Sequence, residues 1–319
     1  MNAAVVSEFG EAPRYEELPV PSTVRPDEVL IEVLAAGLHP RVRSQAAGSH
    51  YTSTDELPLV PGIDGVGRTE DGTLRYFILP DTTMGSLAEK TVVDLRRSIE
   101  LRPDTDSTQV AAAMNPAMSS WIALRRRIQF EPGQSVLVLG ATGNAGQLAV
   151  QVAKFLGASQ VVAVGRNARR LTELQSLGAD PILSLEGPPE VVAESVGEAA
   201  KDIDVVLDYL WGQPTSDMLR AIIPRRSDDT LPLTWVQIGS VAGLESPIPS
   251  AALRAARLQI LGSGQGSVST SDIVAELSPL AEEISRGTFE INAREIPLSN
   301  VSHAWAEAAT GSERIVLVP

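Results

Sequence analysis

The stretch that decides the fold is VLVLGATGNAG, residues 136–146. Its four apolar residues predict a buried strand, and the glycine-rich residues after them predict a tight turn into a helix. Ala141, Gly143 and Gly146 stand at the spacing of the dinucleotide-binding motif G-x-G-x-x-G, with alanine in the first position. The stretch therefore predicts a turn that binds the pyrophosphate of a dinucleotide.

Each small residue of this turn has a physical role. A small residue at 141 permits the tight turn, Gly143 lets the backbone approach the pyrophosphate, and Gly146 lets the helix pack closely on the strand. The helix N-terminus adds free N–H groups and the positive end of the helix dipole. The residues predicted to bind the cofactor here are Ala141, Thr142, Gly143, Asn144, Ala145 and Gly146.

The residues after the turn continue the pattern that such a motif requires. Short apolar strands alternate with helices, which predicts parallel βαβ units with both faces of the sheet covered. The predicted strands are 135–140, 161–165, 181–185, 202–210, 233–240 and 258–263. The predicted helices between them are 144–158, 167–179, 188–200 and 214–223. A motif in this context favours dinucleotide binding over an ordinary tight turn.

The end of the second strand, VVAVGRN at 161–167, indicates which dinucleotide binds. An NAD site usually ends this strand with a carboxylate that binds the ribose 2′-hydroxyl. Here Gly165 leaves room, Arg166 and Asn167 follow it, and no carboxylate comes before Glu173. We therefore predict NADPH as the cofactor, with Gly165, Arg166, Asn167 and Arg170 near its 2′-phosphate. The alternative is that these arginines only solvate the start of a helix.

The residues before the turn have a different texture. Alternating apolar residues at 27–38 and 86–94, a hairpin at 62–79 and eight prolines up to position 80 predict a small β-barrel with irregular loops. A helix follows at 107–128, and we expect it to break around Asn115–Pro116. The tail predicts helices at 273–285 and 300–310 and a last strand at 314–319.

Composition excludes several classes of protein. The chain has 319 residues, no cysteine and a formal net charge of −14, so disulfides, a thiol nucleophile and thiolate metal sites are excluded. Nucleic acid and anionic lipid would be repelled. The basic run 125–127 predicts a solvated helix face. No secretory signal or membrane span is expected, and we expect a cytoplasmic location.

The order of these parts resembles the medium-chain dehydrogenase/reductase superfamily. The stretches that support the resemblance are DEVLIEVLAAGLHP (27–40), LPLVPGIDGVGR (57–68), PGQSVLVLGATGNAGQLAVQVAKFLGA (132–158), DVVLDYLWG (204–212) and SERIVLVP (312–319). Within the superfamily the chain is similar to the zinc-free quinone oxidoreductase branch. That resemblance implies NADPH-dependent reduction of a quinone or an α,β-unsaturated carbonyl, and a homodimer.

The resemblance also implies an α/β fold with two kinds of domain. Residues 1–118 would form a GroES-like β-barrel catalytic domain, and residues 119–264 a Rossmann domain with a doubly wound parallel sheet that binds NADP(H). Residues 265–319 would return to the catalytic domain. The substrate cleft would then lie between the domains, with the loop 38–52, the segment near Asn115 and the loops 239–243 and 262–266 in its walls.

The zinc ligands of the zinc-dependent members are missing from this chain. Those members have a cysteine where this chain has His39, and a His-Glu pair after a Pro-Gly where it has Ile63–Asp64. A catalytic zinc needs three protein ligands and an open position, so no metal is predicted. His39, His50 and Asp64 show no metal-binding spacing. The chain also lacks the Asn-Pro-x-Asp run of the quinone reductases, since HPRV stands at 39–42.

Reduction of a conjugated carbonyl places charge on oxygen, which a nearby hydrogen-bond donor stabilises. Tyr51, in the polar loop GSHYTS, is the first candidate for that donor, and His39 is the second because imidazole moves protons near neutral pH. For Tyr51, packing in a surface loop is an equal alternative, and for His39 a structural role is slightly favoured. His50, Arg41 and Arg43 are weaker candidates for substrate or phosphate contacts. His303 and Trp305 are expected at the surface or in packing.

Three further residues are candidates for the cofactor. Gly239 and Ser240 end the fifth strand of the predicted sheet and are predicted to bind the cofactor. Asn115 is a polar residue in an otherwise apolar helix, and it would bind cofactor or substrate or cap the helix that starts at Pro116.

Three alternative functions remain open. A short-chain-type reductase or nucleotide-sensing regulator has a similar fingerprint, but that fingerprint normally opens the chain. A non-catalytic NADPH-binding or redox-sensing protein is the alternative from a different class. A reductase or dehydrogenase that acts on another carbonyl or alcohol is the third.

Overall fold

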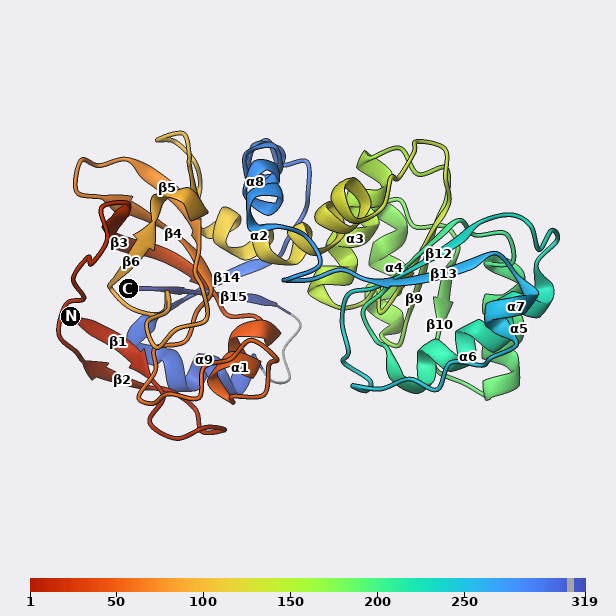
Figure 1. The fold of residues 1–319 in the computed structure, drawn as a ribbon, viewed down its shortest axis with the longest axis horizontal. Helices are drawn as coiled ribbons and strands as arrows, with labels where there is room; N and C mark the ends of the chain where they lie inside the picture. The colour runs from red at the N-terminus through yellow and green to blue at the C-terminus, as the bar shows by residue number, and fades with distance from the viewer. Residues whose placement is uncertain (309–312) are drawn as a thin grey trace. The chain divides into compact units, whose positions relative to one another are not determined.

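A computed structural model describes residues 1–308 and 313–319 of the chain (Figure 1). The chain divides into two compact units. The first consists of Met1–Asn115 and Thr270–Pro319, and the second of Pro116–Ser269. The sequence predicts the corresponding boundaries after residues 118 and 264.

The second unit contains a six-stranded parallel sheet. Its strands are β8 (Val136–Leu139), β9 (Val161–Gly165), β10 (Ile182–Ser184), β11 (Val205–Asp208), β12 (Leu233–Gln237) and β13 (Leu258–Gly262). Their order is β10-β9-β8-β11-β12-β13, and every neighbouring pair is parallel. The chain therefore starts in the middle of the sheet, builds one half, and returns to build the other. This is the Rossmann order, and it confirms the predicted doubly wound fold.

Helices cover both faces of this sheet, as the right-handed crossover rule requires. They are α3 (Asn144–Phe155), α4 (Ala168–Ser176), α5 (Pro189–Ala199), α6 (Gly212–Ile222) with the 3-10 turn η3 (Ile223–Arg225), and α7 (Ala252–Ala255). Figure 1 shows α3 and α4 on one side of the sheet and α5 and α6 on the other. Strand β8 is buried along its whole length, so the turn that follows it starts from a rigid base.

The first unit contains the predicted β-rich domain. Its strands are β1 (Asn2–Val5), β2 (Arg14–Glu17), β3 (Glu28–Gly37), β4 (Asp64–Thr69), β5 (Leu74–Ile78), β6 (Lys90–Asp94), β7 (Ser98–Glu100), β14 (Ala293–Pro297) and β15 (Arg314–Val318). The main sheet has the order β14-β15-β3-β4-β5-β7, and β6 also pairs with β3. The hairpin β4–β5 and the alternating strands β3 and β6 confirm the predicted ones. Ile31, Val33 and Phe77 belong to its core.

Short helices complete the first unit. They are α1 (Pro40–Ala46), the 3-10 turns η1 (Leu95–Arg97) and η4 (Leu298–Asn300), α8 (Thr270–Ser285) and α9 (Val301–Glu307). Helix α8 begins three residues before its predicted start. The predicted end of the last helix at Thr310 lies outside the described residues.

The predicted helix break at Asn115–Pro116 is wrong, because α2 (Ser107–Ile122) runs through both residues. Pro116 has no N–H, so the carbonyl oxygen of Ala112 loses its helical donor. The buried Arg314 supplies another donor, since its Nε donates to that oxygen at 3.1 Å. Helix α2 then continues into a π-helical turn, η2 (Ala123–Arg127).

The predicted basic helix face is present in η2. Arg125 and Arg126 are exposed, and the Arg125 guanidinium lies 4.9 Å from the ring centre of Trp121. Among the helices of the described residues, none combines the length and the hydrophobicity that a bilayer crossing requires.

Candidate active site

The phosphate turn joins β8 to α3 as the sequence predicts. Gly143 is the residue before α3, and no side chain caps the helix there. A Cβ atom added to Gly146 would lie 2.3 Å from the carbonyl oxygen of Gly140, so glycine is required for packing at that position. A Cβ added to Gly143 would meet only that same oxygen, at 3.6 Å. The protein thus leaves no space for a side chain at Gly146. Beside Gly143 it leaves space in which a ligand can approach the backbone.

Gly165 packs against the phosphate turn. A Cβ added to Gly165 would lie 2.6 Å from Cγ2 of Thr142, so the side chain of Thr142 fills the space that the glycine leaves. The glycine therefore brings the end of β9 against the phosphate turn.

Arg170 connects the start of α4 to the same turn. Its Nη1 donates to the carbonyl oxygen of Thr142 at 2.6 Å, and its Nη2 donates to Oδ1 of Asn144 at 3.4 Å. Asn167 caps α4, because its Oδ1 accepts from the backbone N–H of Arg170 at 3.1 Å. Burial lowers the pKa of Arg170. Arg166, at the end of β9, is exposed. The guanidinium of Arg170 is therefore fixed on the turn, whereas that of Arg166 is solvated.

A buried carboxylate at the end of β11 organises the next loop, and sequence reasoning missed it. Oδ1 of Asp208 accepts from the backbone N–H groups of Leu210 and Trp211, at 2.8 and 2.9 Å. Its Oδ2 accepts from Thr215 at 2.5 Å and from Trp235 at 2.9 Å. Trp211 has a φ of 55°, which only a well-supported backbone tolerates outside glycine. The position of Asp208 at the end of an apolar strand is the sequence signal that could have identified this residue.

Tyr209, the residue after Asp208, connects the carboxyl end of β11 to α2. The hydroxyls of Tyr209 and Ser119 are 2.9 Å apart, and burial raises the pKa of Tyr209 to about 12. Gly239 packs against this tyrosine, since a Cβ added there would lie 2.7 Å from the Tyr209 carbonyl oxygen. Ser240, the next residue, is exposed. Gly239 and Ser240 therefore lie at the carboxyl edge of the sheet, as the phosphate turn does.

In the first unit, His39 belongs to a fully buried polar cluster. Its Nε2 lies 2.9 Å from Oδ1 of Asp64, and the hydroxyl of Tyr76 donates to Oδ2 at 2.8 Å. The cluster also includes Arg314, whose pKa burial lowers to about 10 against the opposite effect of Asp64 and Tyr76. Burial lowers the pKa of His39, which the hydrogen bond with Asp64 offsets only in part. The neutral imidazole is favoured, so His39 is a poor proton donor near neutral pH.

Tyr51 lies on an exposed loop of the first unit, with 72% of its surface accessible. Its ring centre is 4.2 Å from that of His50, at an interplanar angle of 32°. Thr52 donates to Asp81 at 2.5 Å and accepts from Arg41 at 2.7 Å, and Arg41 forms an ion pair with Asp81. Arg41 is therefore a structural residue of this loop, and the network fixes the residue that follows Tyr51.

His50 and Arg43 also take up contacts with the protein. Burial and the neighbouring Arg41 lower the pKa of His50 to about 4. The guanidinium of Arg43 lies 5.0 Å from the ring centre of Trp305 and donates to its carbonyl oxygen. Trp305 is buried, whereas His303 is exposed and lies 3.0 Å from Glu307. These positions match the expected surface and packing roles.

Asn115 lies inside α2 and is partly exposed. It does not precede a new helix, so the alternative of a cap for a helix from Pro116 is wrong.

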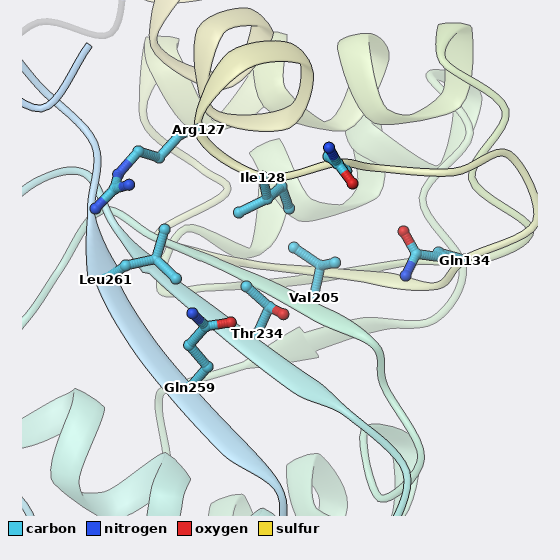
Figure 2. Close-up of a pocket in the computed structure, with 8 residues that line it drawn as sticks. Arg127, Ile128, Gln134, Val205, Thr234, Gln259 and Leu261 are labelled. Atoms are coloured by element: carbon cyan, nitrogen blue, oxygen red, sulfur yellow. The ribbon is translucent and has the colours of Figure 1, made fainter.

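A separate pocket of about 260 Å³ lies at the opposite edge of the parallel sheet. Val205, Thr234 and Gln259 lie at the first or second residue of their strands, and Figure 2 shows Arg127, Ile128 and Gln134 beside these strands. The residues that line the pocket are Arg127, Ile128, Gln129, Gln134, Val205, Thr234, Gln259 and Leu261. The pocket is thus remote from the phosphate turn, because the amino and carboxyl ends of parallel strands lie at opposite edges.

The chain has relatives along its whole length. It is 31% identical over 363 aligned positions to a probable NADPH-dependent quinone reductase of Emericella nidulans, with 100% of both chains covered. The chain belongs to the medium-chain dehydrogenase/reductase superfamily, in its quinone oxidoreductase-like branch. A family model described as zinc-binding dehydrogenase matches residues 145–283.

Other members of the superfamily extend this comparison. The chain is 27% identical to an NADPH-dependent alkenal/one oxidoreductase of Arabidopsis thaliana, over 77% of this chain and 72% of that protein. Among solved structures, the quinone oxidoreductase of Thermus thermophilus, crystallised also as its complex with NADPH, superposes with a TM-score of 0.84. It is 25% identical, and 100% of both chains is covered. Such neighbours have the expected GroES-like and Rossmann domains.

The residues of this chain do not fit the zinc of the superfamily's zinc-dependent members. His39 and Asp64 bond directly to each other, and Ile63 takes the position of a ligand. His50 lies apart from them, on Thr52. Within residues 1–308 and 313–319, no three histidine, aspartate or glutamate side chains form a group that could hold a metal ion.

Proposed function

We propose that this protein is an NADPH-dependent oxidoreductase that transfers a hydride to a quinone or an α,β-unsaturated carbonyl without zinc. The observation that carries the proposal is the phosphate turn, open at Gly143 and closed at Gly146, at the start of an uncapped helix. The full-length likeness to a probable NADPH-dependent quinone reductase supports the same activity.

The surroundings of the turn favour NADPH over NADH. A 2′-phosphate needs cations and no nearby free carboxylate. Arg166 is exposed at the end of β9, and Arg170 is fixed on the turn itself. The first carboxylate after β9, Glu173, lies 3.7 Å from Arg169, so its charge is partly balanced.

Hydride chemistry is supplied by C4 of the bound nicotinamide, and the protein binds and orients the reactants. The N–H groups at the start of α3 and the Arg170 guanidinium would hold the phosphates. When the acceptor gains a hydride, negative charge develops on its oxygen, and a hydrogen-bond donor there lowers the barrier. We propose Tyr51 for that donor, because its loop is fixed by Arg41, Thr52 and Asp81 and 72% of the residue's surface is accessible.

Steady-state oxidation of NADPH with a panel of quinones and enones tests the proposal. We expect turnover that survives exhaustive chelation, and Tyr51→Phe should lower kcat while leaving the Kd for NADPH unchanged. Tight NADPH binding without turnover of any acceptor would instead favour the non-catalytic, redox-sensing alternative. An activity confined to alcohols or to isolated carbonyls would favour the third alternative.

A homodimer is also part of the proposal. Strand β13 ends the parallel sheet and, among the described strands, is hydrogen-bonded only to β12. An edge of this kind pairs readily with a second chain. Light scattering should give twice the mass of the chain, and Ile260→Pro should yield a monomer by removing an edge N–H group. A cytoplasmic location stays a prediction from the sequence.

A further inference from the structure

The pocket of Figure 2 lies wholly within the second unit, because all of its lining residues fall between Pro116 and Ser269. Its volume of about 260 Å³ is just below the range of about 300–1,000 Å³ that sites for drug-sized ligands occupy. A dinucleotide needs more room than this, so the pocket has the size for a small metabolite.

The floor of the pocket is a row of side chains across three parallel strands. Val205 of β11 pairs with Thr234 of β12, which in turn pairs with Gln259 of β13. Residues paired in this way point to the same face of the sheet, so the three side chains stand next to one another. Strands of a covered parallel sheet are normally apolar on both faces. The hydroxyl and the amide in this row are exceptions, and they favour a polar occupant.

Arg127 is the only charged residue among the described residues that line the pocket. Its Nε donates to the carbonyl oxygen of Gly262 at 2.7 Å, which fixes the guanidinium against the end of β13. That bond uses neither Nη atom, so the hydrogens on both can pair with a carboxylate. Figure 2 shows Arg127 and Gln134 at opposite ends of the pocket, with Ile128 between them.

The end of the pocket at Gln134 offers a further hydrogen-bond donor. Oε1 of Gln134 accepts from the backbone N–H of Glu131 at 2.9 Å, so the amide N–H₂ is the group that can meet a ligand. Asp204, which precedes Val205, does not line the pocket. Its Oδ2 accepts from the backbone N–H and the hydroxyl of Ser135, at 2.7 and 2.8 Å. No carboxylate among the described lining residues therefore opposes an anion, although the chain carries a net charge of −14.

Aliphatic side chains complete the lining. They are Ile128, Val205 and Leu261. We propose that this pocket is a second binding site, which takes a small carboxylate with an apolar body. The carboxylate pairs with the Nη atoms of Arg127, and the body lies between Ile128 and the floor of the pocket. The site does not depend on the proposed function, because the phosphate turn lies at the opposite edge of the sheet.

Benzoate is the probe for this site, and benzamide, its uncharged isostere, is the matched control ligand. Methyl NMR of protein labelled in isoleucine, leucine and valine reports on the pocket through Ile128, Val205 and Leu261. Loss of a signal in Ile128→Val assigns residue 128. We expect benzoate to shift these methyl signals with a Kd of about 1 mM or lower, and benzamide to bind about tenfold more weakly.

Arg127→Met removes the cation of the site. It should weaken benzoate about tenfold or more and leave the binding of benzamide nearly unchanged. Arg126→Met is the control, because Arg126 is an exposed residue of the same turn, η2, and does not line the pocket. It should keep the wild-type Kd for benzoate. NADPH, titrated by fluorescence, should bind equally well with and without benzoate.

Several results would overturn the proposal. Benzoate that shifts none of the pocket methyl signals does not bind there, and benzoate that binds no better than benzamide excludes a carboxylate site. The comparison of these two ligands on the wild type holds even if Arg127→Met fails to fold. Benzoate that loses affinity in Arg170→Met but not in Arg127→Met binds beside the phosphate turn instead.

A second copy of the chain is the competing occupant, since Gln259 and Leu261 belong to the edge strand β13. If benzoate shifts the pocket methyl signals only in a monomeric Ile260→Pro variant, and not in a wild-type dimer, the partner chain fills the pocket and the proposal is overturned. If the protein binds benzoate here but oxidises NADPH with no acceptor, the proposed function fails and the inference holds.

Discussion

Nε of Arg314 donates to the carbonyl oxygen of Ala112 at 3.1 Å, and this oxygen is the one that Pro116 leaves without a helical donor. Arg314 is buried, and its charge also acts on Asp64 and Tyr76. One side chain from β15 thus compensates a proline in α2 and balances the carboxylate beside His39.

Replacement of Arg314 should therefore be costly. Arg314→Met removes the donor to Ala112 and leaves Asp64 buried without its counter-charge, so we expect the free energy of unfolding to fall by about 3–5 kcal/mol. Urea titration measures this. The exposed Arg286, paired with Glu282 and Glu283, provides the control, and Arg286→Met should cost about 1 kcal/mol or less.

Pro116→Ala tests the same relationship from the other side. The new N–H at 116 can donate to the Ala112 carbonyl oxygen, so the Arg314→Met/Pro116→Ala double variant should be less destabilised than the sum of the single changes. The expected coupling is about 0.5–1.5 kcal/mol. Strict additivity would show that the Ala112 oxygen does not link the two residues.

The roles of Gly143 and Gly146 in the phosphate turn can be measured separately. Gly143→Ala adds a methyl group where the protein leaves space, so the Tm should hold while NADPH binding weakens by about tenfold or more. Gly146→Ala forces a Cβ to within 2.3 Å of the Gly140 oxygen, so it should lower the Tm as well. Thermal melts and fluorescence titration distinguish the two. Unchanged NADPH binding in Gly143→Ala would place the pyrophosphate elsewhere.

The two arginines beside the turn should affect the cofactors differently. Arg166→Asp should raise the KM for NADPH by about 10- to 100-fold through loss of a charge-assisted bond, with little change for NADH. Arg170→Met removes the bond to Thr142 and should weaken both cofactors. The exposed Arg169→Ala is the control. Equal effects of Arg166→Asp on both cofactors would contradict the assignment of the 2′-phosphate.

His50 predicts a pH dependence of stability. Its pKa is about 4 in the folded protein, against about 6.5 in the unfolded chain, so only the unfolded state binds this proton between those values. The stabilisation is present above pH 6.5 and is lost as the pH falls toward 4. Burial also lowers the pKa of His39, so this residue likewise makes the protein less stable as the pH falls. Urea titrations from pH 7 to 4 should show a shallower loss in His50→Gln, and a curve parallel to wild type would refute the role of His50.

The sequence predicts the parallel sheet well because local signals and global topology agree there. The residues at 136–146 combine strand, turn and helix signals in one continuous stretch, and the alternation that follows leaves few topologies. The break at Asn115–Pro116 is predicted wrongly because the compensating donor, Arg314, lies two hundred residues away in the chain. A local pattern cannot represent a partner supplied by tertiary structure.

The candidate site is predicted only in part, for a related reason. Gly165 and Arg166 are predicted from the pattern, and their contact with the cofactor stays a prediction. The contact of Gly165 with Thr142 depends on the packing of β9 against the turn. In the sequence, Asp64 stands out only because Ile63–Asp64 occupies the place of the His-Glu pair of the zinc-dependent members. Its pairing with His39 and Tyr76 appears only once β4, β5 and the start of α1 are placed together.

The most direct test of the central claim follows the hydride itself. NADPH with deuterium at both C4 positions is mixed with the protein and an enone such as 4-phenylbut-3-en-2-one, with and without a chelator. The account predicts one deuterium on the carbon β to the carbonyl for each NADPH oxidised, a solvent hydrogen on the α carbon, and no effect of the chelator. A product without deuterium, or NADPH that binds and is never oxidised by any acceptor, would contradict the account.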